Sequence, residues 1–91
     1  MPEDAAARRV VTAADIARLA GLLDRFEHAL DPEAPATRQA ELDFEAGVQE
    51  LFTACVRPFY ATITYPQFRG HVRWHCRAWL AVEACKPPIS L

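Results

Sequence analysis

The sequence has few glycines and lacks both hairpin turns and long apolar runs. Only three of its 91 residues are glycine, and none stands in an Asn-Gly or Asp-Gly pair, the strongest short signal for a β-hairpin. The alternation of apolar and polar residues that marks a strand occurs only as a hint at Tyr60–Tyr65. No apolar run approaches the roughly 18 residues of a membrane span. These absences argue against a β fold and against a membrane protein.

The motifs of common enzymes are also absent. The chain has no Cys-x-x-Cys, no His-Glu-x-x-His, no glycine-rich phosphate loop and no Ser-His-Asp arrangement. Its cysteines are odd in number and have no paired spacing, which is poor evidence for a disulfide framework. No signal peptide is visible at the N-terminus. We therefore favour a non-enzymatic, cytoplasmic protein without a cofactor, and the Ala-, Arg-, Glu- and Leu-rich composition suggests a bacterial one.

The residues that are present fit one small globular domain with an uneven distribution of charge. The hydrophobic fraction is 52% and the charged fraction is 24%. Residues 1–50 carry a net charge of −6 and residues 51–91 a net charge of +4, which together give the formal −2 of the chain. A domain of this size has a thin core, so association with a second chain would add useful burial. An antiparallel dimer would place the acidic half of one chain against the basic half of the other.

The first helix is expected at residues 12–30. Thr12 and Asp15 have the spacing of a capping box, with Asp in place of Glu. The apolar residues that follow recur at steps of 3 and 4 on one face: Ile16, Leu19, Leu23, Phe26 and Leu30. Glu27 lies at the margin of this face, where we expect an ion pair across the bundle to an arginine. A short helical turn is also expected within residues 2–10.

The second helix is expected at residues 37–57, with an extension to residue 63. Thr37 is the predicted N-cap, and Pro58 must kink or interrupt the helix because it lacks an N–H. Acidic residues cluster in the first half, where the helix dipole favours them. The apolar face consists of Phe44, Val48, Leu51, Phe52, Cys55 and Phe59.

The third helix is expected at residues 66–86, with Thr64 or Tyr65 as its cap, and a tail follows at residues 87–91. The helix stops before Pro87-Pro88. Its predicted apolar seam consists of Phe68, Val72, His75, Trp79 and Val82. Three amphipathic helices joined by short loops predict an all-α fold, a small three-helix antiparallel bundle, in a single domain of residues 1–91.

The third helix carries most of the candidate functional residues. Arg69, Arg73 and Arg77 form one stripe, predicted to lie opposite the seam, and Trp74 borders it. Tyr60, Tyr65 and Trp74 have no place on the predicted apolar faces, and exposed Trp, Tyr and Arg are typical of interface hot spots.

We therefore predict a protein-interaction module or assembly subunit, with a homodimer or another protein as its partner. The alternative is that the arginine stripe and Trp74 bind nucleic acid.

A metal site is a third hypothesis. His71 and His75 have the i, i+4 spacing that lets two imidazoles on one helix share a metal ion. A third ligand would have to come from elsewhere in the fold, and Cys55, Glu41 and Glu27 are the candidates. The competing interpretation of His75 is a core histidine with one hydrogen bond, because it stands in the middle of the predicted seam.

Overall fold

The computed structural model describes residues 10–56 and 62–85, and all of its regular structure is helical. The elements are α2 (Ala13–Glu27), α3 (Pro35–Leu51), the short π-helical turn η1 (Phe52–Val56) and α4 (Tyr65–Cys85). No strand occurs in these two ranges. The predicted all-α fold with three main helices is therefore confirmed.

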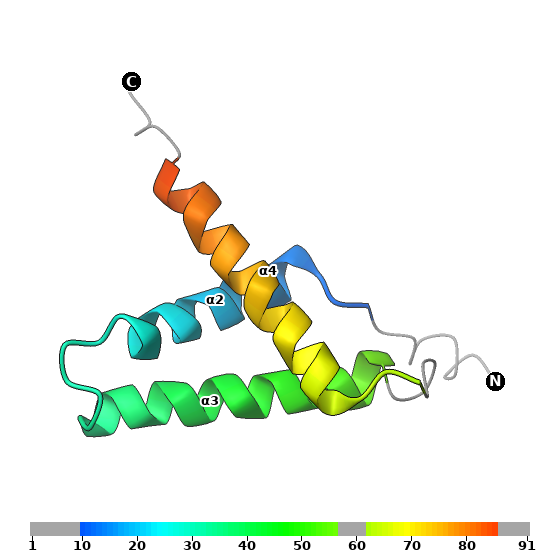
Figure 1. Cartoon of the computed structure of the whole chain (residues 1–91), viewed down its shortest axis with the longest axis horizontal. Coiled ribbons are helices and arrows are strands. Elements are labelled where there is room, and N and C mark those ends of the chain that lie inside the picture. The colour runs from blue at the N-terminus through cyan, green and yellow to red at the C-terminus, as the bar shows by residue number, and fades with distance from the viewer. Residues whose placement is uncertain (1–9, 57–61, 86–91) are drawn as a thin grey trace.

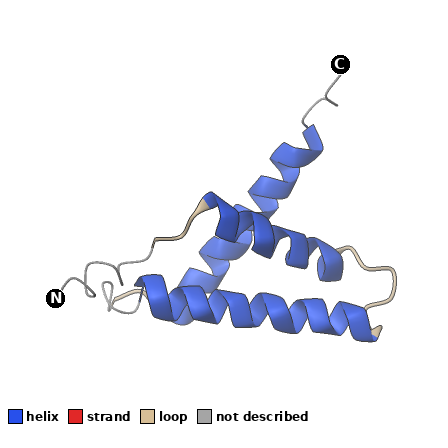
Figure 2. Ribbon diagram, turned by 180° about the vertical axis from the view of Figure 1, so that it is seen from behind, coloured by secondary structure: helices blue, strands red, loops and turns tan. Residues whose placement is uncertain are grey.

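The helices are arranged as a hairpin crossed by a third helix. α2 and α3 run antiparallel, and α4 crosses them with its first turns near the end of α3 (Figure 1). The view from behind shows that the C-terminal end of α4 projects beyond the hairpin (Figure 2). Residues 81–85 are all exposed, in agreement with this projection. The last turns of α4 are therefore presented to the surroundings rather than packed against α2 or α3.

The start of α2 is fixed by the capping box that the sequence predicts. The hydroxyl of Thr12 accepts a hydrogen bond from the Asp15 N–H at 3.2 Å, and the Thr12 N–H donates to the Asp15 carboxylate at 2.9 Å. The helix ends at Glu27, three residues earlier than predicted, after which His28 closes the last turn. Leu30 is consequently fully exposed and does not belong to the apolar face on which we placed it.

The beginnings of α3 and α4 each differ slightly from the prediction. α3 starts at Pro35, because a proline in the first turn loses no helical hydrogen bond. The hydroxyl of Thr37 instead donates to the Asp31 carbonyl at 3.0 Å and ties down the preceding loop. α4 starts at Tyr65, and Thr64 caps it by accepting a hydrogen bond from the Gln67 N–H at 3.3 Å.

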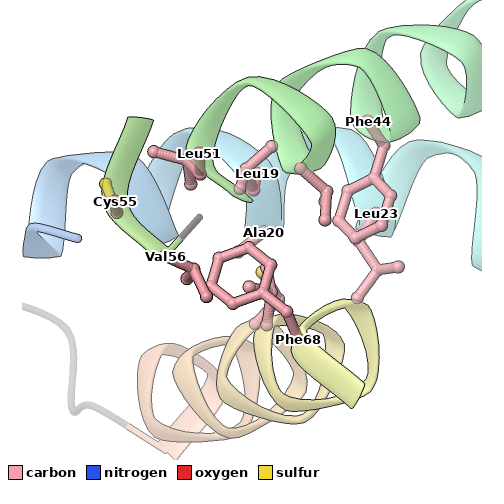
Figure 3. Packing of buried hydrophobic residues seen from close by; sticks show 11 residues of the cluster. Leu19, Ala20, Leu23, Phe44, Leu51, Cys55, Val56 and Phe68 are labelled. Atoms are coloured by element: carbon pink, nitrogen blue, oxygen red, sulfur yellow. The ribbon is translucent and has the colours of Figure 1, made fainter. Parts of the chain in front are cut away.

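One apolar core joins the three helices. Leu19 and Leu23 of α2 meet Phe44 and Leu51 of α3, and Phe68 of α4 reaches toward them from the other side (Figure 3). The core also includes residues whose burial completes the packing: Ala20, Val48, Cys55, Val56, Val72 and Cys76. The predicted burial of Cys55 is confirmed.

The apolar seam of α4 differs from the predicted one. Phe68, Val72 and Cys76 are buried at steps of four, whereas His75 is exposed and Val82 is 59% exposed. Placing Cys76 in the core buries a thiol, which is less costly than burying an imidazole with two polar nitrogens. The last residues of α4, 81–85, are all exposed, and this end of the helix projects beyond the hairpin (Figure 1). The predictions of a core histidine and of a buried Val82 are therefore wrong.

Several predictions fall on residues outside the described ranges. They concern the helical turn within residues 2–10, apart from Val10 itself, the interruption at Pro58, the core role of Phe59, and the tail. In the ranges that are described, no helix is long and apolar enough to cross a membrane.

Candidate protein-interaction surface

Arg69 of α4 forms a bidentate ion pair with Glu45 of α3. Its Nε atom lies 2.9 Å from both carboxylate oxygens, and its Nη2 atom donates a second hydrogen bond to Oε1. The side chains are 37% and 29% exposed, so the pair lies at the rim of the core. Tyr65, one turn earlier, donates its hydroxyl to the same carboxylate at 3.4 Å. This ion pair links the first turns of α4 to α3.

Glu27 at the end of α2 accepts hydrogen bonds from two arginines of α4. The Nη2 atom of Arg73 lies 2.9 Å from Oε2, and the Nη2 atom of Arg77 lies 2.7 Å from the same oxygen. The Arg73 guanidinium also lies over the ring of Phe26, 5.9 Å from its centroid. The predicted ion pair from Glu27 across the bundle is confirmed, and it links the middle of α4 to α2.

These contacts shift the pKa values of the groups that take part. Hydrogen bonds from Arg77, and then from Arg73, lower the pKa of Glu27 even though burial opposes the shift. The hydrogen bonds from Arg69 lower the pKa of Glu45 in the same way. Both carboxylates therefore stay ionised to a lower pH in the folded chain than in an unfolded one.

The arginine stripe consequently flanks the core instead of lying opposite it. Arg69 and Arg73 are half-buried, whereas Arg77, nearer the projecting end, is 59% exposed. The three guanidinium groups meet two carboxylates, which leaves a net charge of +1 in the cluster. Part of the charge asymmetry between the two halves of the sequence is thus neutralised inside the chain.

The two tyrosines of the candidate surface do not stand beside Trp74. Tyr65 is half-buried and packs edge-on against Phe52, with 5.4 Å between the ring centroids. Burial, followed by the negative charge of Glu45, raises the pKa of the Tyr65 phenol. Tyr60 lies outside the described residues. Tyr65 therefore positions α4 on the hairpin and offers little surface to a partner.

Trp74 is the large side chain that α4 presents outward. It is 65% exposed, and it touches only the edge of the neighbouring His75 among the ring contacts of the described residues. At about 100° per residue, it lies opposite the buried Val72 and Cys76. The uncharged residues on the same side of the helix, which the exposed Arg77 borders, form what we call the outer face: Gly70, Trp74, Ala78, Ala81, Val82 and Cys85.

A hollow of about 380 Å³ adjoins the outer face. One wall is the start of α2 and the other is α4, and its lining is Val11, Thr12, Ala13, Ile16, Phe68, His71, Val72 and His75. His71 and His75 are both exposed and separate the hollow from the outer face. The lining is mainly apolar and holds no Asp, Glu, Lys or Arg, so the hollow suits an apolar or aromatic group.

The histidine pair does not meet a third metal ligand. Within the described ranges, no group of three or more His, Cys, Asp and Glu side chains could hold a metal ion. Glu27 is engaged by arginines and Cys55 is buried in the core. Burial also raises the pKa of the Cys76 thiol to about 11, which disfavours the thiolate that a metal would need. His71 and His75 alone therefore offer two ligands.

Sequence reasoning missed the hollow and the role of Glu45. The hollow is formed by residues about 60 positions apart in the chain, and no local pattern reports their proximity. The burial of Cys76 did have a signal, since cysteine is among the most buried residue types and histidine is not.

Comparisons of the chain with models of protein families, with curated proteins and with solved structures found no match. Any function of the candidate surface must therefore be inferred from the residues of this chain alone.

Proposed function

We propose that this protein is a small cytoplasmic helical protein-interaction module or assembly subunit without a catalytic role. The outer face of α4, centred on Trp74, is its binding surface. α2 and α3 serve as a scaffold that holds α4 in place through the core and through the ion pairs of Glu27 and Glu45.

The observation that carries the proposal is the exposure of Trp74 on the outer face of α4. At 65% exposure, Trp74 presents about 160 Å² to water, if a full tryptophan surface is taken as about 250 Å². Covering that area stabilises a complex by roughly 3–4 kcal/mol before the costs of association. Tryptophan is enriched among the residues that dominate binding energy, and its indole N–H adds a directed hydrogen bond.

Nucleic-acid binding stays the alternative prediction. It draws on Arg77, which is exposed, and on Trp74 as a stacking group. The ion pairs of the other two arginines support the protein-interaction proposal instead, because a phosphate would have to compete with carboxylates already in place. Only a net charge of +1 in the cluster is available to attract a polyanion.

A photo-crosslinking amino acid at position 74 tests the proposal, with position 42 as the matched control. Leu42 of α3 is 64% exposed, so the two positions are equally accessible. In cells that produce the full chain, we expect irradiation to give a covalent adduct of defined mass from position 74 and none from position 42. An absence of adduct at position 74, or the same products from both positions, would contradict the proposal.

A further inference from the structure

We propose that the partner of the outer face is a second copy of this chain, and that each copy inserts Trp74 into the hollow of the other. This inference rests on the proposed function, because it names the occupant of the same surface. The two features that it joins, a protruding indole and a hollow of about 380 Å³, lie next to each other on α4.

The position of the two features suits a two-fold axis. In a symmetric dimer the same patch serves both copies, so a residue and the site that it enters on the partner can lie side by side on one copy when the axis passes between them. Trp74 has this arrangement, because its ring touches His75, which lines the hollow, with 5.1 Å between the ring centroids. An axis that passes beside His75 brings each indole to the partner's hollow, and both contacts form together.

The chemistry of the hollow matches an indole. Val11, Ile16 and Val72 supply apolar walls, and the hydroxyl of Thr12 and the imidazole of His71 stand among them as polar groups. An indole has an apolar body and one N–H donor, so it fills such a site without leaving a buried charge.

The charge of the surface favours a second copy over a partner of opposite charge. The lining of the hollow contains no Asp, Glu, Lys or Arg, and the exposed Arg77 at the border of the outer face is already paired with Glu27 of its own chain. A charged side chain of another partner would therefore enter the hollow without a counterpart, whereas the indole of a second copy enters it without a charge.

The available area is adequate for a dimer of this size. Gly70 to Cys85 spans about 24 Å of helix, and half the lateral surface of a cylinder about 10 Å wide and that long is roughly 400 Å². The hollow and the exposed Val10 and Val11 at the start of α2 extend this surface. The total approaches the 600 Å² or so that each partner contributes at the lower end of specific interfaces.

Two variants test the protruding indole of Trp74 and the hollow that receives it separately. Trp74→Ala removes the indole, and Ala13→Glu places a charge in the lining of the hollow. Ala13 is exposed at the first position of α2, where the helix dipole favours an acidic residue, so the second variant should fold. Leu42→Ala is the control, because Leu42 is equally exposed on another helix.

Sedimentation equilibrium of the purified full chain supplies the readout. We expect the wild type and Leu42→Ala to dimerise at micromolar concentration, and each of the other two variants to weaken the dimer by about 30-fold or more. Far-ultraviolet circular dichroism and the melting temperature confirm that each variant is folded.

Mixing the two weakened variants gives the decisive result. The mixed dimer pairs the intact Trp74 of one chain with the intact hollow of the other, so one of the two contacts is restored. We expect the mixture to associate more tightly than either variant alone. Equal association of all three samples, or a Trp74→Ala variant that dimerises like the wild type, would overturn the inference.

The inference and the proposed function fail in different ways. A wild-type chain that is still monomeric at about 100 μM overturns the inference that the partner is a second copy. If position 74 still forms a specific adduct with another protein in cells, the outer face keeps its proposed function. If the chain is monomeric and position 74 forms no adduct, both are rejected.

Discussion

At the scale of single residues, Gly47 determines how closely the two helices of the hairpin approach. A Cβ atom added at this position would lie 2.7 Å from Cδ2 of Leu19 and 3.3 Å from a guanidinium nitrogen of Arg18. Leu19 is fully buried, so its side chain has no free space into which it could move. The absence of a side chain at Gly47 is therefore required by the packing of α2 on α3.

Two glycine-to-alanine variants test this role. Gly47→Ala gains about 1 kcal/mol of helix propensity but overpacks the core by about 1–3 kcal/mol, so we expect a net loss of stability. Gly21→Ala is the control, since no atom lies within 4 Å of its added Cβ and the position is exposed on α2. It should stabilise the chain by about 0.5–1 kcal/mol. Urea denaturation measures both values, and a stabilising Gly47→Ala would refute the close approach.

The sequence identified residues correctly where a local motif or a place on a helix face decides the role, as it does for Cys55 and Glu27. The Thr12 capping box needs only residues three apart, and it is present. The choice between His75 and Cys76 for the core of α4 depends instead on a rotation of the helix by about 100°, which the tertiary packing decides. The periodic pattern of apolar residues fits either His75 or Cys76 in the core, so the pattern alone could not decide between them.

At the scale of elements, α4 is held on the hairpin by apolar contacts and by two acidic residues at the rim. Glu45 ties its first turns to α3, and Glu27 ties its middle to α2. The C-terminal end of α4 projects beyond the hairpin (Figure 2). The periodicity of the sequence predicted the three helices, but it gave no information on the direction in which α4 leaves the hairpin of α2 and α3.

The stability of the fold should depend on acid pH through these carboxylates. Their pKa values are lowered on folding, so the stability they contribute is fully present above their unfolded pKa of about 4.5 and is lost as the pH falls through the folded values. Glu45→Gln should lower stability by about 1 kcal/mol at pH 7, after allowance for solvent screening, and flatten the decline below pH 4.5.

Glu50→Gln is the matched control for this prediction. Glu50 lies on the same helix and is exposed, so its loss should leave the acid limb of the curve nearly unchanged. Thermal unfolding followed between pH 3 and pH 7 measures the wild type and both variants. An identical acid slope in the wild type and in Glu45→Gln would show that the pair with Arg69 contributes nothing.

At the scale of the whole molecule, the chain has a small core and a helix with two different sides. The inner side of α4 completes the core through Phe68, labelled in Figure 3, and through Val72 and Cys76. The outer face carries Trp74 and small uncharged residues. The composition and charge of the sequence indicated a small helical domain whose thin core would gain burial from association with a second chain. They could not show the hollow, because it exists only where the start of α2 meets α4.

The fluorescence of Trp74 reports whether its indole becomes buried when two copies associate. The chain has two tryptophans, so Trp79→Phe leaves Trp74 as the sole emitter, and Trp79 is half-buried against the core. As the concentration rises through the micromolar range, we predict that the emission shifts to shorter wavelength and that acrylamide quenching falls. In the same background, Ala13→Glu should keep Trp74 exposed throughout. Emission and quenching that stay those of an exposed indole at every concentration would contradict the account.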